Sequence, residues 1–391
     1  MKLLEFLKKY NIGKPPWRYH HLLNLDPSEY PKYLKKIYKI RTGKTLNLEH
    51  PKTFSEKIQR IKLYGITDLM RNCTDKVKVR DFVKEKIGEE YLKPVLQIIP
   101  NESKETMRCH CEQVNDNSGL ARQSADRCNH ILDCHADIKM SSSARLRFPK
   151  FQFRENRVLA EYNDKALIYK DNDNENNVVS AYFDQINFDK LPNAFVLKCN
   201  HGCKWHCTIK DKEKFLSEKQ VFEITKNKIT GWLEQEFWVW EGFEMNYKGI
   251  KPKILIEPFM PAKRYIEIYC FNGIPQIYSD IQLENEVKIC TYNKDFSYSD
   301  LILKKDDEKF MCKFSADNIL KQAAELSKKL SHDFKFVRVD WFIPNCEIQS
   351  NTNSKEKQNN LLFEELTFTP YSGFTLFDEK WNKKLGDFIE L

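Results

Sequence analysis

The sequence lacks any long apolar run. No stretch of its 391 residues approaches the roughly 18 consecutive apolar residues that a membrane-spanning helix needs. The first residues, MKLLEFLKKYNIGKPP, also lack the apolar core and small-residue cleavage site of a signal peptide. This pattern predicts a cytoplasmic protein whose first segment packs on its own core, with peripheral contact to the cytoplasmic membrane as the alternative.

Internal repeats and an export signal are absent too. Without export, the 12 cysteines are expected to be thiols in a reducing cytosol rather than a disulfide framework. The formal charge is a mild +8, which suits anionic ligands such as nucleotides or uronic-acid glycans. A hydrophobic fraction of 41% is enough for a sizeable core and excludes a disordered chain.

Composition divides the chain into four regions. Residues 1–100 are expected to be mainly helical, and residues 101–180 form a polar, cysteine-containing insertion. Residues 181–260 and 261–391 mix strand and helix patterns. Strands and helices mixed in this way indicate an α+β fold.

Helix signals recur along the chain. An apolar stripe over residues 51–65 predicts a helix capped by Thr53 or Ser55, and residues 74–88 predict a second, capped by Thr74 and ended by Gly88. Three later helices are expected. They cover residues 212–236, residues 315–330 with Ser315 as the cap, and residues 378–391.

Strand signals lie between the helices. A short strand is expected near residues 91–99, and a hairpin is expected to turn at Asn272 and Gly273. The other expected strands are 193–200, 253–260, 336–343 and 361–368, the last two paired with each other.

Two of these strands carry carboxylates among apolar residues. Asp340 alternates with Val339 and Trp341, and Glu365 is similarly flanked, so both should face away from the apolar side of the sheet. Carboxylates on neighbouring strands can hold Mg²⁺ that bridges nucleotide phosphates, and Arg338 could stabilise a transferring phosphoryl group. A solvated sheet face with a salt bridge fits the same pattern.

The stretch FVLKCNHGCKWHCTIKD, residues 195–211, offers two kinds of site. Its cysteines, Cys199, Cys203 and Cys207, recur every four residues, a spacing that matches no common zinc scheme. Lys198, followed by the glycine-containing turn 200–202, suits phosphate instead, because a lysine and backbone N–H groups can approach it. We therefore expect the lysine, rather than the sulfurs, to carry the chemistry.

A second cysteine group lies in the polar insertion. Cys109, Cys111, Cys128 and Cys134 stand beside three histidines in a segment without a core of its own, which a metal could stabilise. Their Cys-x-Cys and Cys-x5-Cys spacings are unusual for zinc. A polar loop with incidental thiols is the preferred interpretation.

Six ordered segments of the chain point to one family. They are HPKTFSEKIQRIKLY, DKVKVRDFVKEKIGEEYLKPVL, LPNAFVLKCNHG, IKPKILIEPFM, YCFNG and FEELTF followed by Pro and Ser-Gly-Phe. Together they are similar to the TupA-like ATP-grasp family of bacterial surface-polysaccharide loci, over residues 50–100 and 185–391. The resemblance implies an ATP-grasp fold, in which two α+β subdomains at 181–260 and 261–391 clasp ATP behind a helical N-terminal region.

The resemblance also implies contacts with ATP. Lys198 matches the lysine that meets the nucleotide phosphates. The matching residues of the phosphate-covering loop are Asn200, His201 and Gly202, and those of the hinge strand beside adenine and ribose are Glu257, Pro258, Phe259 and Met260.

A metal site is implied as well. Arg338 matches the catalytic arginine, and Asp340 and Glu365 match the two acidic Mg²⁺ ligands. Thr367 stands where the wider superfamily has Asn, and its hydroxyl can still ligate Mg²⁺.

Three features depart from the family pattern. Glu267 occupies a position where members commonly carry Lys, so that one phosphate contact would fall to Arg264 or Lys263. The loop between Asp340 and Glu365 is longer than the family's turn, which a hairpin tip tolerates. Residues 101–180 have no recognised counterpart.

The implied function is ATP-dependent ligation of a carboxylate to an amine through an acyl phosphate, with ATP and Mg²⁺ as cofactors and no nucleic acid as partner. The product would be an amide on a uronic-acid-containing capsule or surface-glycan precursor. One alternative is a glycosyltransferase, although the common Asp-x-Asp signature occurs only at residues 171–173. A non-catalytic glycan-binding relative is the other, and Glu267 favours it. The sequence does not indicate the oligomeric state.

Overall fold

The structure is a computed structural model that describes residues 17–100, 179, 181–283, 286–303, 305–345, 361–375 and 377–391. Both the first residues and the insertion cysteines 109–134 fall outside these ranges, so the predictions for them are not tested. Within the described ranges, no helix combines the length and apolarity needed to cross a membrane.

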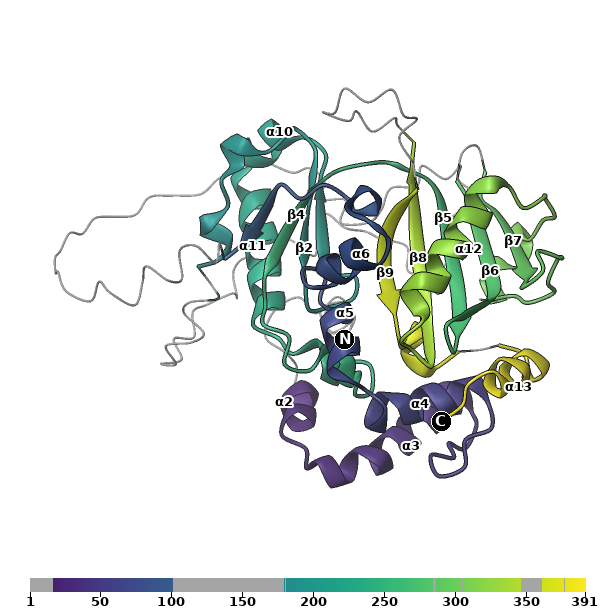
Figure 1. The fold of residues 1–391 in the computed structure, drawn as a ribbon. Coiled ribbons are helices and arrows are strands. Elements are labelled where there is room, and N and C mark those ends of the chain that lie inside the picture. The colour runs from purple at the N-terminus through teal and green to yellow at the C-terminus, as the bar shows by residue number, and fades with distance from the viewer. Residues whose placement is uncertain are drawn as a thin grey trace.

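Two antiparallel sheets form the α+β core that the sequence predicts (Figure 1). Sheet A has the order β1-β4-β2-β3, and sheet B has the order β7-β6-β5-β8-β9. The strands of sheet A are β1 Gln97–Ile99, β2 Phe195–Cys199, β3 His206–Ile209 and β4 Ile254–Pro258. Those of sheet B are β5 Ala262–Phe271, β6 Ile274–Gln282, β7 Lys288–Asn293, β8 Phe336–Pro344 and β9 Leu362–Thr367.

The expected strands and hairpin are present, but β3 and β7 were not predicted. Asn272 and Gly273 join β5 to β6 with φ of 49° and 73°, the left-handed values that a tight hairpin turn requires at both positions. β8 pairs with β9 as expected. Val339 and Trp341 face the core while Asp340 lies on the other face, because side chains alternate along a strand.

The helices before sheet A are α2 Trp17–Leu23, α3 Tyr30–Thr42, α4 Phe54–Tyr64, α5 Asp68–Thr74 and α6 Val79–Ile87. Thr53 caps α4 in a capping box with Glu56, which settles the choice between the two expected caps. The expected cap at Thr74 was wrong, because Thr67 caps α5 and Thr74 ends it. Gly88 ends α6 as predicted.

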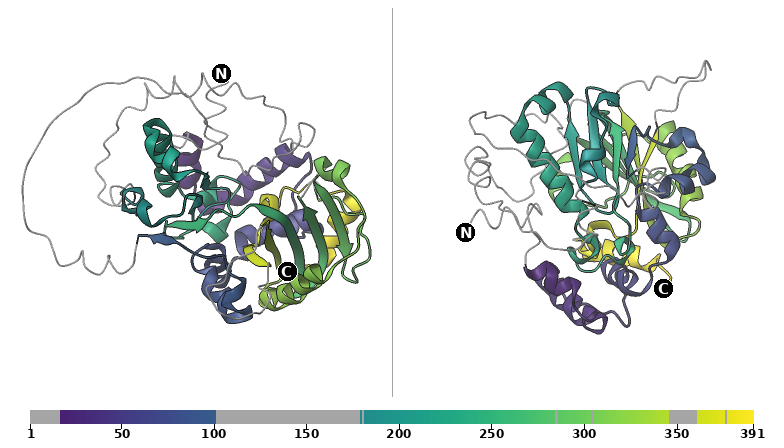
Figure 2. Two further views of the ribbon diagram at one scale, coloured as in Figure 1. Left: turned by 90° about the horizontal axis from the view of Figure 1, so that it is seen from above. Right: turned by 90° about the vertical axis from the view of Figure 1, so that its left-hand side faces the viewer.

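Two of the later helices each pack on one sheet. The segment expected as one helix at 212–236 is broken into α10 Lys212–Ser217 and α11 Lys219–Leu233, and α11 packs on sheet A. α12 Asn318–Ser331 packs on sheet B, and α13 Glu379–Asp387 contacts α4 (Figure 2). Asp317 caps α12, not Ser315, since its carboxylate accepts from the N–H of Leu320.

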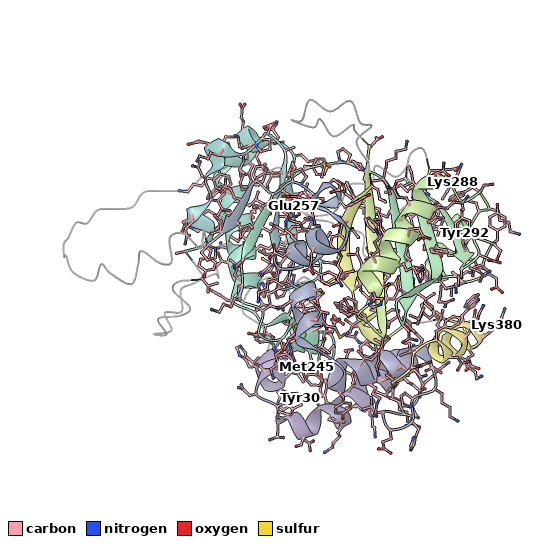
Figure 3. All side chains as sticks on the ribbon, viewed as in Figure 1. Tyr30, Met245, Glu257, Lys288, Tyr292 and Lys380 are labelled. Atoms are coloured by element: carbon pink, nitrogen blue, oxygen red, sulfur yellow. The ribbon has the colours of Figure 1, made fainter. Side chains whose placement is uncertain are left out.

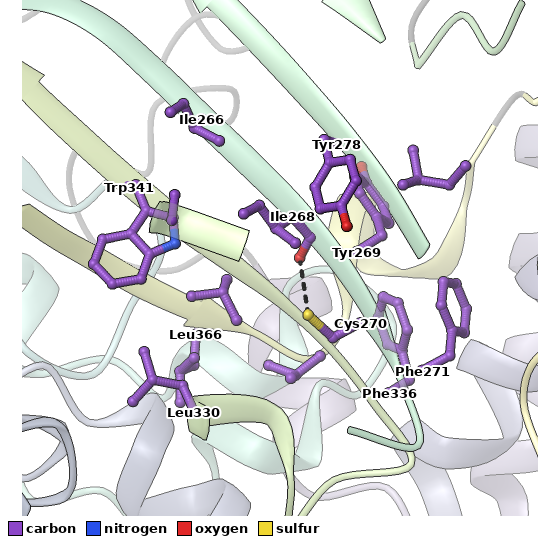
Figure 4. Close-up of a cluster of buried hydrophobic side chains, with 14 of the residues drawn as sticks. Ile266, Ile268, Tyr269, Cys270, Phe271, Tyr278, Leu330, Phe336, Trp341 and Leu366 are labelled. Carbon is purple, nitrogen blue, oxygen red and sulfur yellow. Dashed lines mark hydrogen bonds between the residues drawn. The ribbon is translucent and has the colours of Figure 1, made fainter. Parts of the chain in front are cut away.

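The core of sheet B lies under α12. Ile266, Ile268 and Cys270 point from β5 toward Trp341 of β8 and Leu330 of α12 (Figure 4). The Cys270 thiol donates to the carbonyl of Ile268 at 3.8 Å. This packing leaves the opposite face of β5 and β8 to polar residues.

The N-terminal region joins both sheets. Phe54 of α4 packs edge-on against Phe336 of β8, with ring centroids 5.0 Å apart, while β1 pairs with β4 of sheet A. α5 contacts β9 and α6 contacts α12, so this pair lies between the two sheets (Figure 1). Residues 17–100 therefore help to shape the space between the sheets.

Candidate functional site

A pocket lies where α5 and α6 meet both sheets. Its lining includes apolar residues, among them Leu255 and Leu366, and seven charged side chains. The charged side chains are Lys198 and Glu257 from sheet A, Glu364 and Glu365 from β9, and Lys76, Arg80 and Lys93 from the N-terminal region.

Lys198 reaches the pocket because β2 alternates. Leu197 and Cys199 are buried in the core of sheet A, so Lys198 between them points to the other face. Its ammonium lies 2.7 Å from Glu257 and 3.6 Å from Glu364. Burial disfavours the charged amine, but these two carboxylates outweigh it and raise the pKa of Lys198 above its usual range. The lysine is a fixed positive charge.

Arg338, Asp340, Glu365 and Thr367 form one polar cluster on β8 and β9. Arg338 donates to both oxygens of Asp340, at 2.7 and 2.6 Å. The Thr367 hydroxyl oxygen lies 3.1 Å from Asp340 and 2.8 Å from Glu365. The predicted catalytic arginine and the three predicted metal ligands are thus brought together, and Glu365 also lines the pocket with Lys198.

A β-bulge at Glu364 shapes this edge. Asp340 pairs with Glu365 but Trp341 pairs with Phe363, so β9 has one extra residue at this point. A bulge redirects the side chains around it. Glu364 and Glu365, neighbours in sequence, can therefore both face the pocket, whereas a regular strand would send one of them to the core.

The cluster is short of positive charge. Glu267 is the register partner of Asp340 and lies 3.8 Å from Arg338, which is also 3.9 Å from Glu365. Three carboxylates therefore surround one guanidinium. Burial raises the pKa of Asp340 to about 8 despite Arg338, and the charges of Glu267 and Glu365 add to the rise. A bound divalent cation would relieve this repulsion.

The oxygen set fits Mg²⁺. Asp340, Glu365 and Thr367 offer hard oxygen donors that already approach one another, and Mg²⁺ typically takes one or two carboxylates together with substrate phosphates. Within the described ranges, no group of three or more His, Cys, Asp or Glu side chains is placed to hold a metal ion. The three side chains alone therefore do not make a metal site, and the role of Mg²⁺ here stays a prediction.

The turn after β2 is tied down by its own side chains. Asn200 donates to Asp75 at 2.9 Å and accepts from the N–H of Lys253 at 2.6 Å. His201 is buried against Trp205, with its ring nitrogens near Asn200 and the Trp232 carbonyl. Gly202 has no room for a side chain, because a Cβ there would lie 2.3 Å from the Trp205 ring.

These contacts place Asn200 and His201 away from the pocket lining, and the contact between this turn and phosphate stays a prediction. Lys76 connects the two regions, since its ammonium donates to the carbonyl of Gly202 at 2.6 Å while lining the pocket.

His201 gives a pH test of this packing. Burial lowers its pKa to about 4, below the ordinary value, so the unfolded chain binds more protons as the pH falls. The free energy of unfolding should therefore fall by about 2 kcal/mol from this residue between pH 7 and pH 5. Urea unfolding at pH 7 and pH 5 should show a smaller fall in the free energy of unfolding for His201→Gln than for wild type. The control variant, His50→Gln at an exposed position, should show the same fall as wild type. If the free energy of unfolding of His201→Gln fell as much as that of wild type, a buried, neutral imidazole at this position would be contradicted.

The predicted hinge residues follow one another at the end of β4. Glu257 is buried, is labelled between sheet A and α6 in Figure 3, and lies 2.7 Å from the Lys198 ammonium. Pro258 ends β4, and Phe259 donates its N–H to Ala194 at 3.1 Å. Met260 leads on toward β5. Of the four, only Glu257 lines the pocket, and the contacts with adenine and ribose stay predictions.

Arg264 does not replace the family's lysine. It donates to both oxygens of Asp280, at 2.7 and 2.6 Å, and to Asp317 at the start of α12. These partners lie on the α12 side of sheet B, opposite Glu267. The expectation that Arg264 could reach a phosphate was wrong. Side chains alternate between the two faces along β5, and Arg264 points to the face opposite Glu267.

Two of the three cysteines of the 195–211 stretch lie away from the lysine, whereas Cys203 is partly buried and lies within the electrostatic influence of Glu365. Cys199 and Cys207 are buried in the core of sheet A, on the face opposite Lys198. Burial raises the pKa of the Cys199 thiol well above its ordinary range. Both are packing residues in this fold.

Sequence reasoning missed Lys93 and Glu364. Lys93 pairs with Glu364 across the pocket and stacks over the Phe342 ring, with its ammonium 3.9 Å from the centroid. The doublet of acids in FEEL was a visible signal, but only the bulge places both in the pocket. No local pattern around Lys93 predicts that it pairs with Glu364, because the two residues are 271 positions apart in the sequence.

Sequence reasoning also did not predict the left-handed turn that follows β9. Tyr371 and Ser372 adopt left-handed φ of 52° and 54°, which costs of order 1–3 kcal/mol per residue outside glycine. The buried Lys62 of α4 donates to the carbonyl of Ser372 at 2.9 Å, and Gln59 donates to the same oxygen at 3.1 Å. α4 therefore holds the turn that fixes the end of β9.

Comparisons with known proteins agree with this picture. The profile described as "TupA-like ATPgrasp" matches residues 146–390. The match begins inside the segment 101–180, so residues 146–180 do have a counterpart in the family. It does not extend to the similar segments at 50–100. A search of curated proteins finds no match.

Several solved structures are similar at low identity. N5-carboxyaminoimidazole synthetase from Staphylococcus aureus, complexed with ADP, is 13% identical over 46% of this chain and 35% of that one, with a TM-score of 0.24. D-alanine–D-alanine ligase from Bacillus anthracis is 15% identical over 52% and 56%, with a TM-score of 0.27. The Helicobacter pylori ligase is 17% identical over 54% and 53%, also at 0.27. This chain thus spans about a third to just over half of their length.

Proposed function

Because the chain belongs to the TupA-like ATP-grasp family, we propose that it is an ATP-dependent ligase that joins a carboxylate to an amine through an acyl phosphate. One observation carries this proposal: the pocket between the sheets brings Lys198 of sheet A together with Glu364 and with Glu365, the one member of the β8–β9 cluster that lines it. A nucleotide with Mg²⁺ requires cations for its phosphates and oxygen ligands for the metal, and this pocket is lined by both.

Each residue then has a role. Lys198 binds the phosphates, and Arg338 faces the charge that grows on the transferring phosphoryl group. Asp340, Glu365 and Thr367 would hold Mg²⁺, which when bound neutralises phosphate charge and orients the oxygens. Leu255 and Leu366 line the same pocket and limit water beside the reacting group.

We propose a uronic acid in a capsule or surface-glycan precursor as the carboxylate. The formal charge of +8 and the four cations that line the pocket favour an anionic substrate. The family's association with surface polysaccharides supports the same class, and the amine partner follows from the ligase chemistry.

The test is ADP release. Purified protein with ATP and Mg²⁺ should release ADP only when a uronic acid and an amine are both present, in a one-to-one ratio with the amide formed. Candidate uronic acids and amino acids can be screened with a coupled ADP assay, and mass spectrometry should find the amide.

Two other outcomes would contradict the ligase. A glycosyltransferase would consume a nucleotide sugar without needing ATP. A glycan-binding relative would bind the uronic acid and release no ADP, and Glu267 beside Arg338 at 3.8 Å is the observation that favours it. Glu267→Lys restores the residue common in the family, and ADP release that appears only in this variant would identify a binding protein.

A further inference from the structure

Glu364 is held between two lysines. Its oxygen Oε2 pairs with Lys93, and its oxygen Oε1 lies 3.6 Å from Lys198. Lys93 comes from the N-terminal region, Lys198 from sheet A and Glu364 from the bulge of β9. One carboxylate thus connects three parts of the chain across the pocket.

The two lysines are placed to bind an anion. Their side chains are only 10% and 16% exposed, and Arg80 donates to the carbonyl of Lys93 at 2.8 Å, which fixes its backbone. The Lys93 ammonium also rests on the Phe342 ring. Because both ammonium groups are preorganised around one group with two oxygens, a phosphoryl group, which also presents its oxygens from one centre, matches the same geometry.

The balance of charge supports this. The pocket is lined by Lys76, Arg80, Lys93 and Lys198 against Glu257, Glu364 and Glu365, four cations against three anions. Glu364 forms ion pairs with both Lys93 and Lys198, and its side chain is 27% exposed at the pocket, so it can move aside.

We infer that Lys93 and Lys198 form one phosphate subsite of the nucleotide and that Glu364 competes with the phosphate for it. The inference rests on the proposed function. Lys93, which lies outside residues 146–390 that match the family, becomes a second phosphate-binding lysine, and Glu364 lowers the affinity of the subsite for phosphate.

The experiment is a calorimetric titration with ADP in EDTA, so that no metal contributes. Glu364→Gln removes the competing charge and should tighten ADP binding roughly tenfold, whereas Lys93→Met should weaken it roughly tenfold. In the Lys93→Met background, Glu364→Gln should change affinity by less than about threefold, because one of the two contested contacts is gone. Adenosine, which has no phosphate, should bind all variants alike.

Controls separate this from a structural effect. Lys288→Met removes an exposed lysine on β7 and should leave ADP affinity unchanged, and Lys93→Arg should recover most of the lost affinity. Weaker ADP binding in Glu364→Gln, or equal changes for adenosine, would overturn the subsite. If wild type binds ADP and the variants fail to differ, only the subsite is wrong. If wild type binds no nucleotide even with Mg²⁺, the proposed function is wrong as well.

Discussion

Glu365→Gln and Asp340→Asn are each expected to lower ATP turnover roughly a thousandfold, because a metal that stabilises developing charge contributes several kcal/mol and each 1.36 kcal/mol is tenfold in rate. Glu365 is the cleaner target. It contacts the Thr367 hydroxyl at 2.8 Å and only approaches Arg338, at 3.9 Å. Its replacement by Gln should cost less than about 1 kcal/mol of stability. ADP release at saturating ATP and thermal unfolding measure the two effects.

Asp340→Asn should cost more stability. Asp340 accepts two hydrogen bonds from Arg338, and an amide keeps only one acceptor, so a loss of about 1–3 kcal/mol is expected. The turnover loss should nevertheless match that of Glu365→Gln, since both remove a metal ligand. Restoring turnover at high Mg²⁺ concentration would be further support for a weakened metal site.

A matched control lies on the other face of the same sheet. Asp280 of β6 accepts two hydrogen bonds from Arg264, as Asp340 does from Arg338, but it faces α12. Asp280→Asn should lower the free energy of unfolding by about 3 kcal/mol, since it weakens a buried ion pair, and leave turnover unchanged below its melting temperature. Turnover lost in Asp280→Asn but kept in Glu365→Gln would rule out the metal site at β8 and β9.

The strand pair that carries Asp340 and Glu365 could be predicted from sequence because its pattern is local. Val339 and Trp341 flank Asp340, so alternation alone fixes which face it takes. The turn at Asn272 and Gly273 is equally local, since few residues tolerate two left-handed positions in a row.

What failed depended on partners far away in the chain. Ser315 and Asp317 are both good cap residues, and Asp317 also pairs with Arg264, a residue 53 positions earlier. The break between α5 and α6 follows Thr74, where Asp75 contacts Asn200 across the molecule. Neither the choice of Asp317 as cap nor the break after Thr74 can be predicted from the neighbouring residues alone.

The bulge at Glu364 shows the same limit at the site. In a regular strand, Glu364 and Glu365 would point to opposite faces of the sheet. Only one of them would then face the pocket, and Lys93 would not pair with Glu364. Bulges depend on pairing register, which the two strands determine together. The sequence could identify Glu365 through the family motif, but not the ion pairs beside it.

Lys198→Ala is expected to weaken ATP affinity roughly ten- to a hundredfold. A charge-assisted contact to phosphate contributes about 1.5–3 kcal/mol, and each 1.4 kcal/mol is tenfold in affinity. The structure adds a reason, because the lysine also balances Glu257 at 2.7 Å and Glu364 at 3.6 Å. Its loss leaves both carboxylates to repel the nucleotide. The chemical step should slow too, as negative charge grows on the transferring group. Nucleotide titration and ADP release at saturating ATP measure these effects.

The three cysteines of the same stretch provide the matched comparison. Replacing Cys199, Cys203 and Cys207 together by Ser should leave ATP affinity within about threefold of wild type. Cys199 and Cys207 point into the core of sheet A on the face opposite Lys198, and Cys203 packs against that core and is not among the residues that line the pocket. Some stability should be lost, since buried thiols become hydroxyls that need partners. Lys198→Arg keeps the charge and should recover part of the affinity. A triple Ser variant that folds but neither binds nor turns over ATP, beside an active Lys198→Ala, would show that the sulfurs carry the chemistry and that the phosphate role of Lys198 is wrong.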